Sequence, residues 1–258
     1  MANKIHSTAI VDSNASIEEN VVIGPYTIVE RDVCIGSGTE IGSNVLIKKY
    51  TKIGDNNKIF HGAVIGEIPQ DLKFDNEKSE LIIGNHNTIR EYCTINRGTS
   101  ANGKTIIGDN CLFMAYVHLA HDCILGNNII LANAVQIGGH VEINSYAIIG
   151  GGTPIHQFCK VGESAFVGGG RVILQDIPPY ILATGEPLQF SGLNVLGLRR
   201  RKFNKEKRDL IKKAYKLIYK SSFNISEAIK NIKDSRGNDI DEISNIVNFI
   251  EKSNRGII

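Results

Sequence analysis

Bulky apolar residues recur at every sixth position over most of the first 178 residues. The spacing holds without a slip from Ile5 to Ile65, and again from Ile107 to Ile173. A period of six is neither the two residues of an ordinary strand nor the 3.6 residues of an α-helix, so it indicates a repeat architecture. Apolar residues make up 42% of the chain, so chance does not account for so long an unbroken series.

The residues between these apolar positions predict corners. A glycine often follows the apolar residue directly, and an asparagine often stands three residues after it. Both residue types adopt positive φ at low cost, so each group of six is predicted to be a short strand and a corner. Three corners close a triangular coil of 18 residues, and stacked parallel strands lie about 4.8 Å apart. The sequence therefore predicts a parallel β-helix over residues 1–178.

Two segments, 67–81 and 101–105, interrupt the period. Insertions in a stacked-coil protein leave the coil as external loops, often on the binding face. The longer loop contains Asp71, Lys73 and Phe74, and on sequence alone a binding role and a solvated loop are equally good interpretations. For residues 101–105 we expect a solvated loop without a role.

The last 80 residues lose the period. Pro178 and Pro179 are expected to end the strand ladder, because proline cannot donate a ladder hydrogen bond. A connection and a small helical domain are then expected over 179–258, covering the open end of the coils. Apolar residues at helical spacing predict three helices, near 204–220 after Asn204, near 226–234 after Ser226 and near 239–252 after Asp239.

The charge is divided unevenly along the chain. Residues 199–258 contain 16 Lys/Arg and eight Asp/Glu, a net charge of +8, while the remainder carries −6, and together these give the +2 of the whole chain. Such a basic region suits an acidic partner, although most runs of charge are only a solvated helix face. Nucleic acid is disfavoured as a partner because no aromatic platform or reading motif accompanies the charges.

Composition indicates a soluble, cytoplasmic protein. Charged residues make up 22% of the chain and no apolar run approaches 18 residues, so no membrane span is expected. The first residues lack the apolar region of a secretory signal. Five scattered cysteines without a CxxC pair indicate reduced thiols rather than disulfides or a zinc knuckle.

Histidines supply the candidate chemistry. Counted in coils of 18, His121, His140 and His156 fall within one residue of the same corner in successive coils, with His118 close by. A column of imidazoles suits a cleft that binds polar or anionic groups and transfers a proton near neutral pH, with Asp122 as a candidate to fix the His121 tautomer. An isolated corner histidine is usually only solvated. Zinc binding is the rival functional interpretation, although rings one strand apart converge poorly on a tetrahedral ion.

Several segments resemble one family. They are IGEIPQDLKF, RGT at 97–99, HLAHDC, ILANAVQIGGHVEI, IIGGGTPIHQFC, DIPPYILATG and GLNVLGLRRR. Together they resemble the bacterial UDP-N-acetylglucosamine O-acyltransferases over nearly the whole chain. The resemblance implies a left-handed parallel β-helix with a C-terminal helical domain, assembled as a homotrimer with active sites between subunits. The left hand departs from the usual right-handed crossover and does not follow from the period.

The resemblance also implies a reaction and its cofactors. A 3-hydroxyacyl chain passes from acyl carrier protein to the 3-position of UDP-N-acetylglucosamine, the first step of lipid A biosynthesis. The phosphopantetheine thioester of the carrier is a co-substrate, and no metal or other cofactor is implied. The carrier protein would be attracted by the basic C-terminal region.

Motif by motif, the resemblance assigns residues. His121 matches the general base, Asp122 its partner, and Gly139 the backbone donor facing the developing oxyanion. The implied substrate-binding residues are Asp71 and Lys73 in the loop, His140 at the nucleotide sugar, His118, His156 and Gln157 at further substrate and pantetheine contacts, and Asn194 and Arg200 on the donor and nucleotide side. Gly169 falls where the family sets acyl length.

Two departures leave the acceptor open. Asn96 stands where better-known members carry His, and Leu196 where some carry Glu. Some relatives acylate a 3-amino analogue of the sugar and form an amide, which remains an alternative. A trimeric zinc lyase of the carbonic anhydrase type on the same fold is a second alternative, disfavoured by the HLAH spacing and the loop at 67–81. A non-catalytic coil stack is a third, and it gives no reason for the histidine column.

Overall fold

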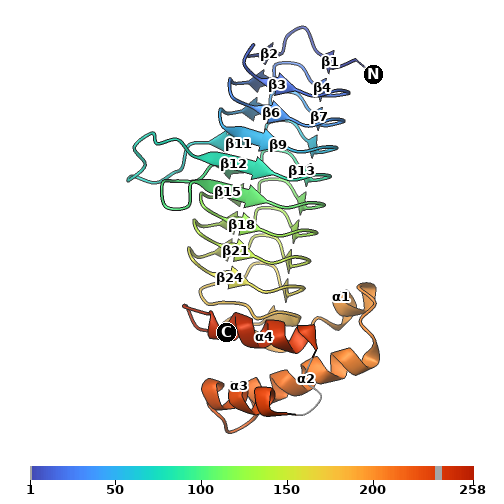
Figure 1. Cartoon of the computed structure of the whole chain (residues 1–258), viewed down its shortest axis with the longest axis vertical. Coiled ribbons are helices and arrows are strands. Elements are labelled where there is room, and N and C mark those ends of the chain that lie inside the picture. Colours follow the sequence, from blue (N-terminus) through green and yellow to red (C-terminus); the bar gives the residue numbers. More distant parts are fainter. Residues whose placement is uncertain (1, 236–239) are drawn as a thin grey trace.

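A computed structural model, which describes residues 2–235 and 240–258, shows a column of stacked coils with four helices at its C-terminal end (Figure 1). Each coil contributes one strand to each of three sheets that run along the column, and the strands are parallel except the last strand of the first sheet, which is antiparallel to its neighbour. The first sheet contains β1 (Lys4–Ile5), β4 (Val22–Ile23), β7 (Glu40–Ile41), β10 (Lys58–Ile59), β13 (Thr88–Ile89), β16 (Leu112–Phe113), β19 (Ile130–Leu131), β22 (Ile148–Ile149), β25 (Phe166–Val167), β26 (Ile181–Thr184) and β27 (Gln189–Leu193).

The other two sheets have eight strands each. The second sheet contains β2 (Ile10–Val11), β5 (Ile28–Val29), β8 (Leu46–Ile47), β11 (Val64–Glu67), β14 (Thr94–Asn96), β17 (His118–Leu119), β20 (Gln136–Ile137) and β23 (Pro154–Ile155). The third sheet contains β3 (Ser16–Ile17), β6 (Cys34–Ile35), β9 (Thr51–Ile53), β12 (Glu80–Ile83), β15 (Lys104–Ile107), β18 (Ile124–Leu125), β21 (Glu142–Ile143) and β24 (Lys160–Val161). The predicted fold class, a left-handed parallel β-helix followed by helices, is confirmed.

The six-residue series forms the interior of the column. Residues 18 positions apart are paired in parallel register, as Leu119 is with Ile137, and both side chains are 1% exposed. Each strand therefore buries one large apolar side chain away from water, and these stacked side chains form a continuous hydrophobic core. Only the first coil is poorly covered, with Ile5 44% exposed.

The corners correct one part of the prediction. The residue three after the apolar position does have positive φ, for example Asn110 at 58°. Except at Gly66, whose φ is 81°, the glycine next to the apolar position does not have positive φ. A Cβ added to Gly108 would lie 2.2 Å from Asn127 Oδ1 and 2.8 Å from the carbonyl carbon of Gly126. These glycines are therefore explained by the close approach of adjacent coils rather than by positive φ.

Both interrupting segments leave the column at the same corner. Residues 68–79 of the longer segment connect β11 to β12, and residues 97–103 connect β14 to β15, so each connection lies between the second and third sheets. We call this the loop corner, and Figure 1 shows both loops projecting from one side of the column. The predicted external loops are confirmed. Asp122 and His140 occupy the loop corner in the next two coils.

The strand ladder continues beyond the two prolines. Strand β26 pairs in parallel with β25, with Phe166 opposite Leu182, so the expectation that Pro178 and Pro179 end the ladder is wrong. Both prolines precede the strand and occupy no position where a ladder N–H is required. The division of the chain at residue 178 therefore remains a prediction.

The four helices are α1 (Val195–Arg200), α2 (Lys205–Lys220), α3 (Ile225–Asp234) and α4 (Asp241–Glu251). Helix α1 was not predicted. Asn204 caps α2 as predicted, accepting from the Lys207 N–H at 2.8 Å. Helix α3 is capped by Asn224, not Ser226, because Asn224 and Glu227 form a reciprocal capping box. The predicted cap Asp239 lies outside the described residues.

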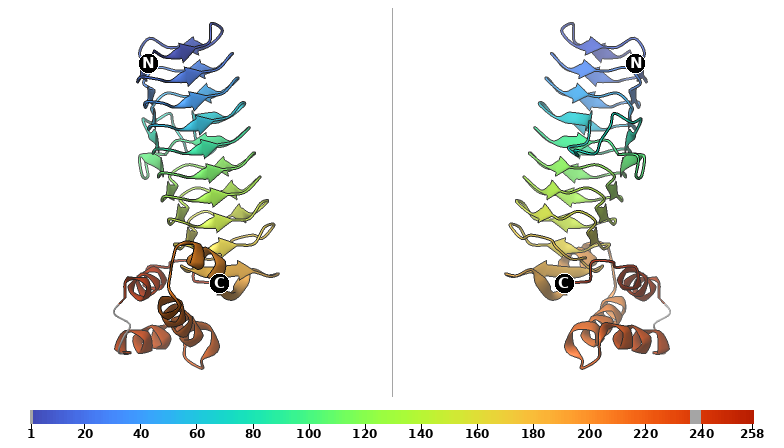
Figure 2. Two further views of the ribbon diagram at one scale, coloured as in Figure 1. Left: turned by 90° about the vertical axis from the view of Figure 1, so that its right-hand side faces the viewer. Right: turned by 90° about the vertical axis from the view of Figure 1, so that its left-hand side faces the viewer.

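The helices cover the end of the column, as Figure 2 shows from two sides. The Tyr215 hydroxyl of α2 donates to the Pro179 carbonyl at 2.6 Å. The Asn245 amide of α4 donates to Glu163 Oε2 at 3.1 Å and to the Tyr180 hydroxyl at 2.7 Å. No helix of the described residues combines the length and apolar character needed to cross a membrane.

Candidate active site

His121 and Asp122 form a buried pair at the loop corner. Leu119 points into the core, His121 follows two residues later, and Asp122 takes the positive-φ corner position at 60°. His121 is 7% exposed and Asp122 is 1% exposed, with His121 Nδ1 2.8 Å from Asp122 Oδ2. A carboxylate at this distance keeps the proton on Nδ1, which leaves the Nε2 lone pair available to accept a proton.

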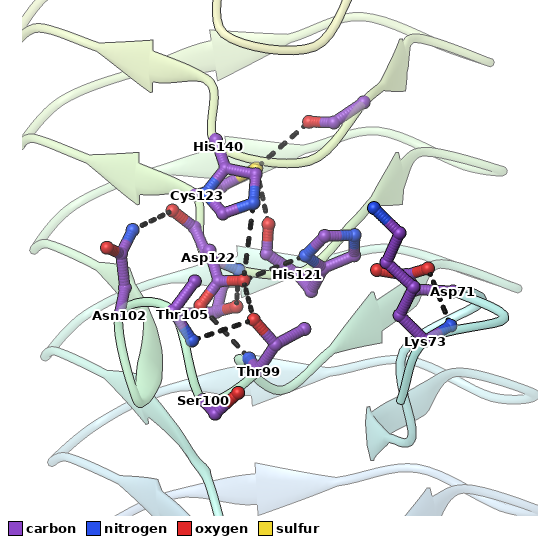
Figure 3. Close-up of polar contacts among 12 residues, drawn as sticks. Asp71, Lys73, Thr99, Ser100, Asn102, Thr105, His121, Asp122, Cys123 and His140 are labelled. Atoms are coloured by element: carbon purple, nitrogen blue, oxygen red, sulfur yellow. Dashed lines mark hydrogen bonds and ion pairs between the residues drawn. The ribbon is translucent and has the colours of Figure 1, made fainter. Parts of the chain in front are cut away.

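The preceding loop holds the carboxylate of Asp122 (Figure 3). The Thr99 N–H donates to Oδ1 at 3.0 Å, and the Thr99 hydroxyl donates to Oδ2 at 2.6 Å. Burial acts to raise the pKa of Asp122, but the hydrogen bonds from Thr99 and His121 together outweigh burial and lower the pKa below its usual value. Asp122 is therefore a fixed negative charge beside His121.

Two of residues 101–105 also contact Asp122, although Ala101, Asn102 and Lys104 are exposed, as expected of a solvated loop. The Asp122 N–H donates to Thr105 Oγ1 at 2.8 Å, and the Asn102 amide lies 3.4 Å from the Asp122 carbonyl. Sequence reasoning missed Thr99, Asn102 and Thr105 because their contacts depend on the path of a loop that interrupts the period. The only signal was the RGT segment, which includes Thr99.

Gly139 lies directly above the His121 ring. A Cβ added there would lie 2.7 Å from His121 Cε1 and 2.8 Å from Nε2, so only glycine allows the ring this position. The Gly139 carbonyl accepts from the Phe158 N–H at 3.1 Å. Within the described part of the chain the Gly139 N–H donates no hydrogen bond. The residue over the His121 ring thus carries a backbone N–H without a partner among the described residues.

The predicted column of three histidines is wrong at its third member. The His121 and His140 rings meet edge to face at 5.2 Å, and His140 Nε2 lies 3.7 Å from Asp122 Oδ2. The ring above His140 is Phe158, stacked at 4.6 Å, and not His156. His156 is exposed and directly follows β23, two residues before the corner position. Its Nδ1 lies 3.1 Å from the carbonyl of Gln157, which is also exposed.

His118 faces outward from β17 near this pair. Its Nδ1 lies 2.8 Å from Thr94 Oγ1 on the adjacent strand. Burial, followed by the nearby His121, lowers the pKa of His118, so its neutral form is favoured.

Asp71 and Lys73 are brought to the same corner by their loop, which leaves the column two coils before His121. The Lys73 N–H donates to Asp71 Oδ1 at 3.0 Å, which forms a tight local turn, and the Lys73 side chain is exposed. Figure 3 shows these residues together with the His121 pair.

Three predicted residues lie away from the loop corner within one chain. Gly169 is exposed at the corner between the first and second sheets, where a Cβ would lie 3.0 Å from the Gly151 carbonyl oxygen. Asn194 is buried and caps α1, donating to the Ser164 carbonyl at 2.9 Å. Arg200 is exposed at the end of α1. One chain alone does not bring these residues to His121.

His121, Asp122 and His140 also form a group that could hold a metal ion, since their ligand atoms lie within 4.8 Å of one another. Two atoms that both bind a tetrahedral zinc at 2.0–2.1 Å stand about 3.3 Å apart. His121 Nδ1 and Asp122 Oδ2 are only 2.8 Å apart, which is hydrogen-bond distance. Both carboxylate oxygens already accept hydrogen bonds from Thr99. The geometry favours a proton between the pair over a metal ion.

Two family models match the chain. The model described as Udp N-acetylglucosamine O-acyltransferase, Domain 2, matches residues 176–258. The model of the bacterial transferase hexapeptide, six repeats, matches residues 4–49 and 104–139.

Full-length relatives are similar to both parts together. The acyl-[acyl-carrier-protein]–UDP-N-acetylglucosamine O-acyltransferase of Aliarcobacter butzleri is 48% identical, covering 99% of this chain and 98% of the relative. The enzyme of the same name from Paraburkholderia phymatum is also 48% identical, covering 99% of each chain. Among solved structures, a UDP-N-acetylglucosamine acyltransferase from Bacteroides fragilis superposes with a TM-score of 0.95 at 45% identity, covering 98% of this chain and 99% of that one.

Proposed function

Because the chain belongs to the UDP-N-acetylglucosamine O-acyltransferase family, we propose that it transfers an acyl chain from acyl carrier protein to UDP-N-acetylglucosamine. The names of its relatives contain both substrates. The segments that resemble the family further suggest that the chain is 3-hydroxyacyl, that the sugar 3-position receives it, and that this is the first step of lipid A biosynthesis.

The observation that carries the proposal is the position of the His121 ring. Asp122 binds Nδ1 at 2.8 Å, and Nε2 lies beside Gly139, whose N–H is unpaired within the described residues. An acyl transfer from a thioester to a hydroxyl requires one base and one donor for the oxyanion, close together. His121 and Gly139 supply these two groups.

The proposed reaction follows from this geometry. His121 Nε2 takes the proton of the sugar hydroxyl as the hydroxyl oxygen attacks the thioester carbonyl carbon. The carbonyl oxygen becomes an oxyanion that accepts a hydrogen bond from the Gly139 N–H. The intermediate collapses to the ester and expels the phosphopantetheine sulfur, which receives the proton from the His121 imidazolium. Asp122 remains ionised and stabilises the imidazolium.

Substrate contacts are proposed for residues around this centre. His140, Asp71 and Lys73 would contact the sugar nucleotide, and His118, His156 and Gln157 would extend the surface toward sugar and pantetheine. Gly169 would leave room for the end of the acyl chain, with Asn194 and Arg200 on the donor side. Since Gly169 and Asn194 lie at other corners of the same chain, the proposal includes a homotrimer in which one subunit's corner faces another's. The site would then be shared between neighbours.

The remaining parts of the proposal concern partners. The acyl donor's phosphopantetheine is the only prosthetic group that the reaction needs, and the protein is proposed to act in the cytoplasm without membrane insertion or nucleic acid. The acidic carrier protein would approach the basic surface of α1 and α2, where Arg200 is exposed.

Acyl-transfer assays on metal-stripped protein test the proposal. They use 3-hydroxyacyl carrier protein of several chain lengths, with UDP-N-acetylglucosamine in one series and its 3-amino analogue in the other. Turnover with UDP-N-acetylglucosamine is expected. A preference for the 3-amino analogue would show that the product is an amide and not the proposed ester. Failure of a folded trimer with both acceptors would refute the proposal, and stoichiometric zinc in the purified protein would then favour the lyase.

A further inference from the structure

Arg97 is buried without a carboxylate partner. The residue is 2% exposed, and no hydrogen-bond partner for its Nε or Nη1 is found among the described residues. The same part of the chain offers it no ion pair within 4.0 Å. Desolvation is costly for a charge without a partner, so a guanidinium in this position requires an explanation.

Two aromatic rings surround the guanidinium. Its central carbon lies 5.5 Å from the ring centroid of Tyr50 and 5.5 Å from that of Phe74. Tyr50 is at the loop corner of an earlier coil, whereas Phe74 belongs to the loop of residues 67–81. Arg97 thus joins this loop to the column through its charge and the two ring faces.

The chain around Arg97 reinforces this connection. Its own N–H donates to the Glu67 carbonyl at 3.0 Å, and the Asn96 amide donates to the Ile68 carbonyl at 2.8 Å. These bonds fix the first residues of the loop. Among the described residues, Phe74 is the only residue between positions 70 and 76 whose side chain makes a ring contact, ion pair or hydrogen bond with the column.

We propose that Arg97 is a positioning residue that fixes the loop of residues 67–81 through Phe74, and so sets the positions of Asp71 and Lys73 for the sugar nucleotide. Lys73 directly precedes Phe74, so any movement of the ring moves Lys73 as well. This inference rests on the proposed function, because it assigns the loop to the sugar-nucleotide site. The inference concerns binding of the acceptor substrate, the sugar nucleotide, and not binding of the acyl donor.

Three variants test the proposal: Arg97→Met, which keeps an unbranched apolar side chain but removes the guanidinium, Phe74→Leu, which removes the ring, and the pair combined. Each is expected to raise KM for UDP-N-acetylglucosamine by about tenfold with kcat within about twofold. KM for acyl carrier protein should not change. The double variant should not raise KM for UDP-N-acetylglucosamine above that of the more affected single variant, because both substitutions remove the same contact between Arg97 and Phe74. Arg97→Lys should recover part of the loss.

Limited proteolysis of the full-length protein provides a second readout, independent of turnover. Cleavage within residues 67–81 should become faster in Arg97→Met and in Phe74→Leu. Arg90→Met is the matched control, since Arg90 also stacks on a ring, that of Phe60 at 4.5 Å, but is exposed and lies on another corner. It should change neither cleavage of the loop nor KM.

The outcomes separate the two proposals. If the wild-type protein shows no turnover, the proposed function fails, and proteolysis alone still decides whether Arg97 fixes the loop. If the wild-type protein turns over and Phe74→Leu changes neither KM nor cleavage, the inference about Arg97 is wrong. Phe74 is half-buried on an external loop, so this variant keeps the test valid even if Arg97→Met does not fold.

Discussion

Thr99 binds both carboxylate oxygens of Asp122, with its N–H 3.0 Å from Oδ1 and its hydroxyl 2.6 Å from Oδ2. Asp122 Oδ2 is also the oxygen that binds His121. The orientation of the proposed base therefore depends on a threonine in a loop one coil before it. Thr99 lies outside the repeat, yet it holds Asp122 in place beside His121, whereas the repeat itself sets the positions of His121 and Asp122.

Thr99→Val removes the hydroxyl and keeps the shape of the side chain. The hydrogen bond to a charged, buried group is worth about 1.5–3 kcal/mol, so the free energy of unfolding should fall by that order. Loss of orientation should lower kcat about tenfold. Thr99→Ser should restore most of both quantities, measured by denaturant unfolding and by acyl-transfer kinetics. Equal effects of Val and Ser would show that the hydroxyl is not the important group.

His121→Ala removes the proposed base. General-base catalysis contributes roughly 10²–10⁴-fold, so kcat should fall by that factor while KM for either substrate changes little. The fold should persist, because the core is formed by Leu119 and its stacked partners. Steady-state kinetics and a thermal melt measure the two effects. Near-normal turnover would remove His121 from the mechanism.

Gly139→Ala places a methyl group against the proposed base. The added Cβ would lie 2.7 Å from His121 Cε1, so the ring must move. A displacement approaching 1 Å costs about 100-fold in rate, and we expect a loss of that order in kcat. A Gly139→Ala enzyme as active as wild type would exclude close contact between this glycine and the base.

The lowered pKa of His118 predicts a pH dependence of stability. The unfolded state binds a proton more readily than the folded state, because burial and then His121 lower the pKa below 6.5 in the folded protein. The contribution of His118 to stability is thus complete above pH 6.5 and declines as the pH falls toward the folded pKa. His118→Gln should lose less stability than wild type between pH 7.5 and about 5.5. Parallel melting curves for both proteins across this range would contradict the prediction.

Much of the fold follows from the sequence because one residue in six must enter the core. Leu119 and Ile137 are buried where the period places them, and the corners lie where the third residue after each has positive φ. His121 and Asp122 could be located because they sit at a fixed distance from Leu119. In a regular coil, the position of a residue determines both how deeply its side chain is buried and in which direction that side chain points.

The rest depends on contacts that have no period. Thr99 and Arg97 act through loops whose paths are set by tertiary contacts, so spacing carries no information about their partners. His156 was misplaced because a shift of two residues from a corner changes where a side chain points. Helix α1, at Val195–Arg200, is six residues long and too short to show a helical pattern.

The pairing of residues 18 positions apart limits how this molecule can change its length. Coils can be gained or lost only as whole units, each altering the separation between two points on the column by about 4.8 Å. Insertions of other sizes would move every following apolar residue out of the core unless they leave at a corner, as residues 67–81 do. Evolution can therefore adjust the spacing between loop and helices only in discrete steps, and finer adjustments must come from single side chains.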